Sequence, residues 1–222
     1  MKIALLGYGR MGKSIEVIAL QRHHSISLKV SDESSDYDFS DTDVAIDFSI
    51  PTVAVRNIKK ALDAGVPVIS GTTGWLEAYD NIIDYCKSKG GTFLYASNFS
   101  LGVNIFFEIN KRLSELMATV DGYDTTIEEI HHTKKLDAPS GTAITLAEDI
   151  IANSTYKNWT LDTPKSDEIH IAAKRIENVP GTHEITYNSE IDSLSIKHTA
   201  HSRQGFAMGA VIAAEWICLL YT

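Results

Sequence analysis

The sequence is poor in the features of membrane, secreted and nucleic-acid-binding proteins. No stretch approaches the ~18 consecutive apolar residues of a transmembrane helix, and the apolar start at residues 1–7 is too short for a signal peptide. The two cysteines, Cys86 and Cys218, lack the spacing of metal ligands, which favours a reducing compartment. Lysine and arginine number 20 against 29 acidic residues, giving a formal net charge of -9. These deficits predict a cytoplasmic protein whose main partner is neither a membrane nor nucleic acid.

The first hundred residues alternate short apolar runs with segments of helical period. Strands are predicted at residues 2–6, 26–30, 44–48, 66–70 and 92–96, and helices at 11–21, 52–64 and 76–89. Repeated β-α-β units of this kind predict an α/β fold, a Rossmann-like, doubly wound parallel sheet with helices on both faces. We therefore expect a first domain over residues 1–98.

The pattern changes near residue 98 to one long helix and mostly strands. The helix at 104–117 would bury Ile105, Phe106, Ile109, Leu113, Leu116 and Met117 on one side. Strands are predicted at 125–130, 169–174, 183–187 and 194–198, around a helix at 141–153. This indicates an α+β second domain over residues 99–202 with a mixed or antiparallel sheet. The final apolar helix, at 204–220, could return to complete the first domain with residues 203–222.

A glycine-rich turn directly follows the first strand and opens a helix. Residues 7–12 fit G-x-G-x-x-G, with Gly7, Gly9 and Gly12 as the glycines and Tyr8, Arg10 and Met11 between them. Such a turn lets backbone N–H groups approach a pyrophosphate at a helix N-terminus. Asp32 lies 20 residues past Gly12, where a carboxylate would bind a ribose 2′-OH, although Ser31 and Glu33 compete for that role. The alternative is a tight turn that binds no ligand.

Two further loops follow strands on the same edge of the predicted sheet. They contain Gly71, Thr72 and Thr73 after the fourth strand, and Ala96, Ser97, Asn98 and Phe99 after the fifth. Ligands of open α/β sheets bind beyond the carboxyl ends of the strands, so these residues are predicted cofactor contacts. Ordinary turn and N-cap chemistry is the alternative.

Positive charge gathers at one point of this acidic chain. His131, His132, Lys134 and Lys135 fall within five residues, and Ser140, Gly141 and Thr142 then begin a helix. Ser140 is a good N-cap, and the N–H groups beyond it suit a carboxylate. An imidazole can deliver a proton at neutral pH, and a lysine can stabilise developing negative charge. We predict an anion site with proton transfer rather than a zinc site, since adjacent strand histidines face opposite ways and no third ligand lies at metal spacing.

A second basic group, His198, His201 and Arg203, precedes the last helix. Arg203 could reach the cofactor or the substrate, and a surface role is the alternative.

The segment from Glu129 to Ala143 carries a specific resemblance. It matches E-x-H-H-x-x-K-x-D-A-P-S-G-T-A, and residues 46–49, 71–74 and 96–100 match further motifs in the same order. The chain resembles the 4-hydroxy-tetrahydrodipicolinate (dihydrodipicolinate) reductase family over essentially its whole length.

The resemblance implies a reaction and roles for residues. A hydride passes from NAD(P)H to a cyclic dicarboxylate with loss of water, giving tetrahydrodipicolinate for lysine and diaminopimelate biosynthesis. His131 matches the proton donor and acceptor, and Lys135 the second proton donor. His132, Gly141 and Thr142 match substrate-binding positions, to which the helix start adds Ser140, and Phe48 joins the cofactor contacts. The first domain would bind the dinucleotide, and the second would bind substrate and form a homotetramer through its sheets, as apolar strands such as 169–173 need covering.

Two alternatives and one preference complete the expectations. Another two-domain NAD(P)-dependent reductase, for example of an amino-acid semialdehyde, lacks support because no obvious catalytic cysteine lies between the domains. A non-catalytic dinucleotide sensor would have no need of His131 and Lys135 together. Asp32 and Glu33 would repel a 2′-phosphate, and only Arg10, Lys13 and Lys29 are near enough in sequence to offset them. NADH is therefore expected to be preferred, while NADPH remains usable.

Overall fold

The computed structural model describes residues 1–31, 36–202 and 204–220. The chain divides into two compact units, Met1–Leu101 with Arg203–Thr222, and Gly102–Ser202. Among the helices of the described ranges, none combines the length and apolar character needed to cross a membrane.

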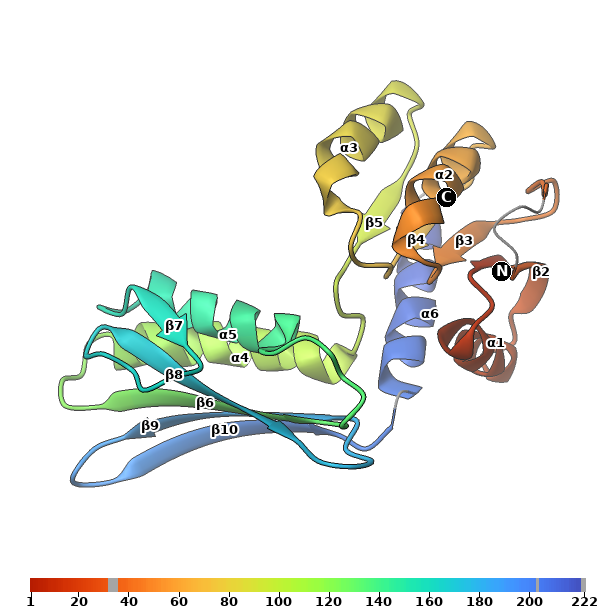
Figure 1. The fold of residues 1–222 in the computed structure, drawn as a ribbon. Coiled ribbons are helices and arrows are strands. Elements are labelled where there is room, and N and C mark those ends of the chain that lie inside the picture. Colours follow the sequence, from red (N-terminus) through yellow and green to blue (C-terminus); the bar gives the residue numbers. More distant parts are fainter. Residues whose placement is uncertain (32–35, 203, 221–222) are drawn as a thin grey trace. The chain divides into compact units, whose positions relative to one another are not determined.

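The first unit is built on a five-stranded, wholly parallel sheet in the order β2-β1-β3-β4-β5. Its strands are β1 Lys2–Leu6, β2 Ser25–Val30, β3 Val44–Asp47, β4 Val68–Ser70 and β5 Phe93–Tyr95, and its helices are α1 Arg10–Gln21, α2 Pro51–Asp63, the 3-10 turn η1 Leu76–Ala78, α3 Tyr79–Ser88 and α6 Gln204–Leu219 (Figure 1). This confirms the predicted doubly wound α/β sheet.

Successive strand residues enter two different cores, as the alternation of side chains along a strand requires. Ile3 and Leu5 pack with α1 and α6, whereas Ala4 and Leu6 pack with α2 and α3. Because both faces are covered, the central strands β1, β3 and β4 are mostly apolar and buried, which is why short continuous apolar runs predicted them, whereas the strand β2 alternates with exposed residues.

Helix α6 belongs to the core of the first unit. A side chain at Gly209 would place its Cβ 1.6 Å from the carbonyl oxygen of Phe99, so glycine allows the helix to approach the chain after β5. Glu215 accepts hydrogen bonds from Arg22 at 2.7 Å and lies 2.8 Å from His24 Nε2. The C-terminal helix is therefore fastened to α1 by packing and by charge.

The second unit has a five-stranded mixed sheet in the order β10-β9-β6-β8-β7. Its elements are α4 Leu101–Met117, β6 Asp124–His131, α5 Gly141–Ala152, β7 Asn158–Thr160, β8 Glu168–Arg175, β9 Gly181–Asn188 and β10 Ser193–Ala200. Strands β6, β7 and β8 run parallel, and β9 and β10 are antiparallel to their neighbours. This confirms the predicted mixed sheet, although the short strand β7 was not predicted.

Helices α4 and α5 lie on one face of this sheet (Figure 1). Ile127, Ile169, Ile171 and Ile185 are buried there with Leu146 and Ile150 of α5. The expectation that strand 169–173 needs covering by another subunit is wrong, because its isoleucines are covered within the unit.

The buried face of α4 differs from the prediction. Ile105 and Ile109 are 50% and 48% exposed, and Asn110 and Ser114 are buried instead. Asn110 donates to the carbonyl of Leu146 at 3.1 Å, and Ser114 donates to that of Asp149 at 3.4 Å. The buried side of α4 thus combines apolar residues, Val103 and Phe106, with polar residues that hydrogen-bond to α5, and apolar periodicity does not detect the polar ones.

Candidate active site

The glycine turn of the first unit has the geometry that its sequence predicted. Gly7 has φ of +95°, and a Cβ there would lie 2.2 Å from the carbonyl oxygen of Phe48. A Cβ at Gly12 would lie 2.3 Å from the carbonyl oxygen of Gly7, so this glycine lets α1 begin directly beneath the turn. At Gly9 no atom of the described residues, apart from its own neighbours along the chain, lies within 4 Å of the Cβ position, which leaves open space there.

The start of α1 fits the pyrophosphate of a dinucleotide. Gly9 is the N-cap and supplies no side-chain hydrogen bond, so the first-turn N–H groups have no side-chain acceptor there. A pocket of about 280 Å³ opens beside the turn, lined by Gly7, Tyr8, Gly9, Val30, Ser31, Phe48, Ser49, Ile50, Val53, Arg56 and Asn57. Free N–H groups and the positive end of the helix dipole are the features that bind phosphate.

A fully buried carboxylate, Asp47, supports the loops around this pocket. Its Oδ1 accepts from Ser49 Oγ at 2.6 Å and Asn57 Nδ2 at 3.1 Å. Its Oδ2 accepts from Ser70 Oγ at 3.0 Å and Thr72 Oγ1 at 2.7 Å. Burial raises the pKa of Asp47, and these four neutral donors only partly oppose that effect. Sequence analysis assigned Asp47 no role, since it is a single acid at the end of an apolar strand with no basic residue nearby.

The structure assigns several predicted cofactor residues to internal contacts. The Thr72 hydroxyl is used by Asp47 and by the Ser49 N–H at 2.9 Å. A Cβ at Gly71 would lie 2.3 Å from the Phe48 ring, so Gly71 makes room for that ring. Phe99 is buried in the core with α1 and α6.

The other predicted cofactor residues differ in exposure. Arg10, Thr73 and Ser97 are exposed, and Met11, Ala96 and Asn98 are half-buried, whereas Asp32 and Arg203 lie outside the described residues. Arg56 of α2, which was not predicted, lines the pocket. Lys29 is paired with Glu16 and lies 4.9 Å from the centre of the Tyr8 ring.

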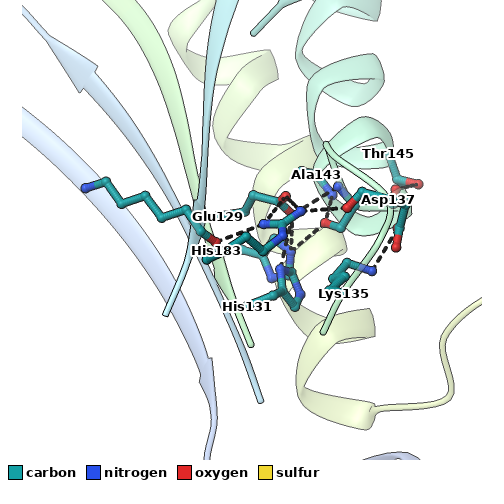
Figure 2. Close-up of polar contacts among 11 residues, drawn as sticks. Glu129, His131, Lys135, Asp137, Ala143, Thr145 and His183 are labelled. Carbon is teal, nitrogen blue, oxygen red and sulfur yellow. Dashed lines mark hydrogen bonds and ion pairs between the residues drawn. The ribbon is translucent and has the colours of Figure 1, made fainter. Parts of the chain in front are cut away.

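In the second unit His131 is the last residue of β6 and is buried. Figure 2 shows the side chains of Glu129, His131 and His183 gathered together, with Lys135 and Asp137 beside them. His131 Nδ1 lies 3.3 Å from Glu129 Oε2, and the centres of the His131 and His183 rings are 5.1 Å apart. A Cβ at Gly181 would lie 3.1 Å from His131 Nε2, so this glycine leaves space beside that nitrogen.

Glu129 is wholly buried and ionised. Arg175 donates to its Oε1 from both Nη1 and Nη2, at 3.2 and 3.1 Å, and the Ser140 N–H donates to its Oε2 at 3.0 Å. Burial alone would raise the pKa of this carboxyl, but the contacts from His131 and Ser140 outweigh burial and lower the pKa to about 2.

His183 of β9 is the neutral member of the group. Burial, and then repulsion from His131, lower the pKa of His183 to about 3. Its Nε2 lies 3.1 Å from Ser140 Oγ, which itself accepts from the Ala143 N–H at 3.2 Å. The Ser140 proton is therefore available to the neutral imidazole of His183.

The predicted helix start is present, and its residues divide into internal and accessible ones. Ser140 is the N-cap of α5 but is buried, and its hydroxyl and N–H are engaged within the protein. Gly141 is exposed, and Thr142 and His132 are half-buried. Lys135 Nζ lies 2.8 Å from Asp137 Oδ2, which holds the lysine on the loop between His131 and the helix.

Sequence analysis missed Arg175 and His183 as members of this group. Both lie on strands more than 40 positions along the chain from Glu129, and only the sheet pairing brings them together. The argument that no third metal ligand exists is wrong once the fold is known, because Glu129, His131 and His183 offer ligand atoms within 4.8 Å of one another. The Glu129 carboxylate, however, already forms an ion pair with Arg175, which disfavours a metal ion there. That this site holds no metal therefore stays a prediction.

A parallel α/β unit with a phosphate-binding turn and a second unit with a buried imidazole are typical of two-domain, nicotinamide-dependent oxidoreductases. Comparison with known proteins identifies the family to which the chain belongs. Residues 1–99 match the family description "Dihydrodipicolinate reductase, N-terminus", and residues 102–221 match "Dihydrodipicolinate reductase, C-terminus".

Two curated relatives are named 4-hydroxy-tetrahydrodipicolinate reductase. The protein of Christiangramia forsetii is 56% identical over 220 residues, covering 98% of this chain and 92% of the relative. That of Methanococcoides burtonii is 37% identical over 213 residues, covering 93% and 80%. A solved structure, dipicolinate-bound dihydrodipicolinate reductase from Paenisporosarcina sp. TG-14, shares the fold with a TM-score of 0.77 at 20% identity, covering 99% and 95%. The chain belongs to the dihydrodipicolinate reductase family.

Proposed function

We propose that this protein uses NAD(P)H to reduce 4-hydroxy-tetrahydrodipicolinate to tetrahydrodipicolinate in lysine and diaminopimelate biosynthesis. The observation that carries the proposal is the pairing of His131 with Glu129 next to the start of α5, in a chain that also has an uncapped glycine turn. Neither a sensor nor a simple binding module needs a buried imidazole beside an ionised carboxylate.

The residues of the second unit divide the chemistry among them. When bound, the nicotinamide cofactor supplies a hydride. His131 is the proposed acid and base, since an imidazole exchanges a proton near neutral pH. Lys135 is the proposed second acid, and its ammonium group would stabilise negative charge that develops on the substrate.

A dicarboxylate substrate needs a cradle for its charge. The exposed N-terminus of α5, at Gly141 and Thr142, offers backbone N–H groups and the positive end of a helix dipole. We assign one substrate carboxylate to this helix start and give His132 a supporting contact. Ser140 would support the same cradle from beneath, because its own polar groups are engaged internally.

The proposed cofactor preference is for NADH over NADPH. Asp32 and Glu33 follow β2 closely in sequence and would repel a 2′-phosphate. Lys29 is paired with Glu16, so it is poorly placed to offset them. Arg56, which lines the pocket, is the cation that would work against the preference. Fluorescence titration with both cofactors tests it, and tighter binding of NADPH at physiological salt would contradict it.

We further propose that the first unit binds the dinucleotide and that the second binds substrate and forms a homotetramer in the cytoplasm. The support for assembly is that α4 and α5 cover one face of the second sheet, while none of the described helices of that unit covers the other (Figure 1). Light scattering that shows a stable monomer at micromolar concentration would contradict the tetramer.

The reaction itself is tested by following nucleotide oxidation with substrate made in situ from pyruvate and aspartate semialdehyde by the preceding synthase. We expect oxidation that requires both the synthase and this protein. Folded protein that oxidises neither NADH nor NADPH in this assay would refute the proposed function.

A further inference from the structure

We propose that Glu129, held in place by Arg175, is a positioning residue that fixes the His131 imidazole relative to the start of α5. The inference rests on the proposed function, because it gives His131 the role of acid and α5 that of substrate cradle. Glu129 acts through these two groups and does not itself need to touch the substrate.

The two oxygens of Glu129 have separate tasks. Oε1 accepts both hydrogen bonds of the Arg175 fork, while Oε2 faces His131 Nδ1 at 3.3 Å and accepts from the Ser140 N–H at 3.0 Å. One rigid carboxylate therefore contacts the proposed acid on β6 and the N-cap of α5 with the same oxygen. Figure 2 shows these contacts converging on Glu129.

Arg175 connects Glu129 to the loop that carries Lys135. Its Nη2 also donates to the carbonyl of Asp137 at 2.6 Å, and Nη1 donates to the carbonyl of Lys174 at 2.8 Å. Asp137 in turn holds Lys135 by an ion pair. A planar guanidinium can make these bonds at once, which a lysine in its place could not.

The contact on Nδ1 decides which nitrogen of His131 can act. Nδ1 is shielded from solvent and faces the carboxylate, although the alignment of the pair falls short of a hydrogen bond. A carboxylate there favours a proton on Nδ1 and leaves Nε2 for transfer to substrate. Gly181 has no side chain to crowd that Nε2, from which a Cβ would lie only 3.1 Å away.

Glu129 also places a negative charge directly beside the His131 imidazole. The other titratable groups around the imidazole are His183 on β9, Lys135 and Asp137 on the loop, and Arg175 on β8, with His198 of β10 next to His183. His183 is neutral at neutral pH, so Glu129 is the anion in closest contact with His131. Removing that anion would leave Nδ1 without its charged neighbour.

The same two strands provide a matched control. Glu128 and Lys174 form an ion pair between β6 and β8, one residue before Glu129 and Arg175, and therefore on the opposite face of the sheet. Their side chains are 34% and 54% exposed, whereas that of Glu129 is fully buried. A general effect of losing a cross-strand pair would appear at both positions.

The experiment compares E129Q with E128Q in the full-length protein. The kcat, KM and pH-rate profile are measured in the coupled assay, and the tautomer of the His131 imidazole is determined by ¹⁵N NMR on histidine-labelled protein, with H131Q used for assignment. We expect E129Q to lower kcat by roughly 10²-fold, as misplacement of an acid does, with a smaller change in the KM for nucleotide. The preference of His131 for a proton on Nδ1 should be lost, and the pH-rate profile should differ from that of the wild type. E128Q should match the wild type in all four measurements.

Unchanged kcat and an unchanged His131 tautomer in folded E129Q would overturn the proposal, as would equal effects in E128Q. If E129Q does not fold, R175K provides the test, since it keeps the charge but loses the fork, and a wild-type kcat and His131 tautomer in that variant would likewise overturn it. An inactive wild type would refute the proposed function instead, while the NMR measurement would still report whether Glu129 orients His131.

Discussion

The two units each bury a carboxylate completely, yet the two groups are held in opposite ways. Asp47 accepts only neutral donors, from Ser49, Asn57, Ser70 and Thr72, and its pKa is raised. Glu129 has a guanidinium on one oxygen and an imidazole near the other, and its pKa is lowered to about 2. Neither side chain is exposed to solvent, and what distinguishes Glu129 is that it has charged partners where Asp47 has only neutral ones.

The difference matches what each site is proposed to do. The Asp47 cluster connects the loops at the ends of β3 and β4 and holds the wall of a nucleotide pocket, a task that hydrogen bonds alone perform. The Glu129 cluster adjoins a group proposed to exchange protons, and there a fixed charge is proposed to hold the orientation of that group. Asp47 thus has a structural role, whereas Glu129 is proposed to support catalysis.

The largest expected effect is on turnover in the second unit. His131→Gln removes the proposed acid and should lower kcat by ~10²–10⁴-fold. Nucleotide binding, measured by fluorescence, should remain near that of the wild type, because the glycine turn belongs to the other unit. Full turnover in this variant would remove the reason for regarding the Glu129 cluster as catalytic support.

Lys135→Met provides the second kinetic comparison, with Lys134→Met as its control. Lys135 is paired with Asp137 and half-buried, whereas Lys134 is exposed. Loss of a second acid should again lower kcat by ~10²-fold or more, and the control should be unaffected. Equal rates in the two variants would contradict the assignment of Lys135.

Stability should distinguish a buried ion pair from an exposed one. Arg175→Met leaves Glu129 charged and buried without its cation, so the free energy of unfolding should fall by about 3 kcal/mol. Lys174→Met breaks the exposed ion pair between Lys174 and Glu128, one residue earlier on each strand. This change should alter the free energy of unfolding by less than ~1 kcal/mol. Urea denaturation measures both, and similar losses would show that the burial of Glu129 has no special consequence.

Acid should destabilise the second unit through His183 and Glu129. His183 has a pKa of about 3 when folded against an ordinary 6.5, so the unfolded chain binds the extra proton and stability falls as the pH drops from 6.5 towards 3. Glu129 adds a further loss from 4.5 down to 2. The contribution of His183 should approach ~1.4 kcal/mol per pH unit within that window. The fall in the free energy of unfolding per pH unit should be smaller in His183→Gln. An unchanged dependence on pH would contradict the conclusion that His183 is neutral in the folded protein.

Asp47→Asn should change the free energy of unfolding only slightly, in contrast to Arg175→Met. The raised pKa means that Asp47 contributes stability at low pH that is lost as the pH rises through its folded value. An uncharged amide keeps most of the hydrogen bonds, so the free energy of unfolding at pH 7 should change by ~1 kcal/mol or less. A loss as large as that of R175M would show that Asp47 is a charged centre like Glu129.

The smallest effect is expected at Arg56. Arg56→Gln removes the one cation among the described lining residues of the nucleotide pocket. It should weaken NADPH binding by a few-fold relative to NADH, equivalent to less than ~1 kcal/mol for a partly exposed charge. Equal weakening of both cofactors would show that Arg56 does not contact the 2′ position.

The fold of the first unit was predictable to a large extent because its central strands are covered on both faces. Apolar runs such as 2–6 and 44–48 and the glycine turn were sufficient to predict a parallel doubly wound sheet, which the structure confirms. The buried side of α4 was not predictable, because Asn110 and Ser114 are buried through hydrogen bonds to α5 rather than through apolar contact. A three-residue strand such as β7 is too short for a period of two to be detected.

The site was predictable where its residues are consecutive. Residues 129–143 form one motif, and His131, Lys135 and Ser140 could be selected from it directly. Arg175 and His183 could not be selected, since each is one polar residue on a strand whose pairing partner is set by the sheet. Asp47 was likewise hidden, because a buried acid held by neutral donors has no opposite charge nearby in sequence.

The central claim, that this chain transfers a hydride from a nicotinamide cofactor to its cyclic substrate, is tested most directly by isotope transfer. The substrate is generated in situ by the synthase and reduced with NADH deuterated at the transferable position, using each of the two C4 stereoisomers separately, and the product is analysed by mass spectrometry. We predict that one of the two cofactors yields tetrahydrodipicolinate carrying a single deuterium. Product without deuterium from either cofactor, or no product at all, would contradict this account.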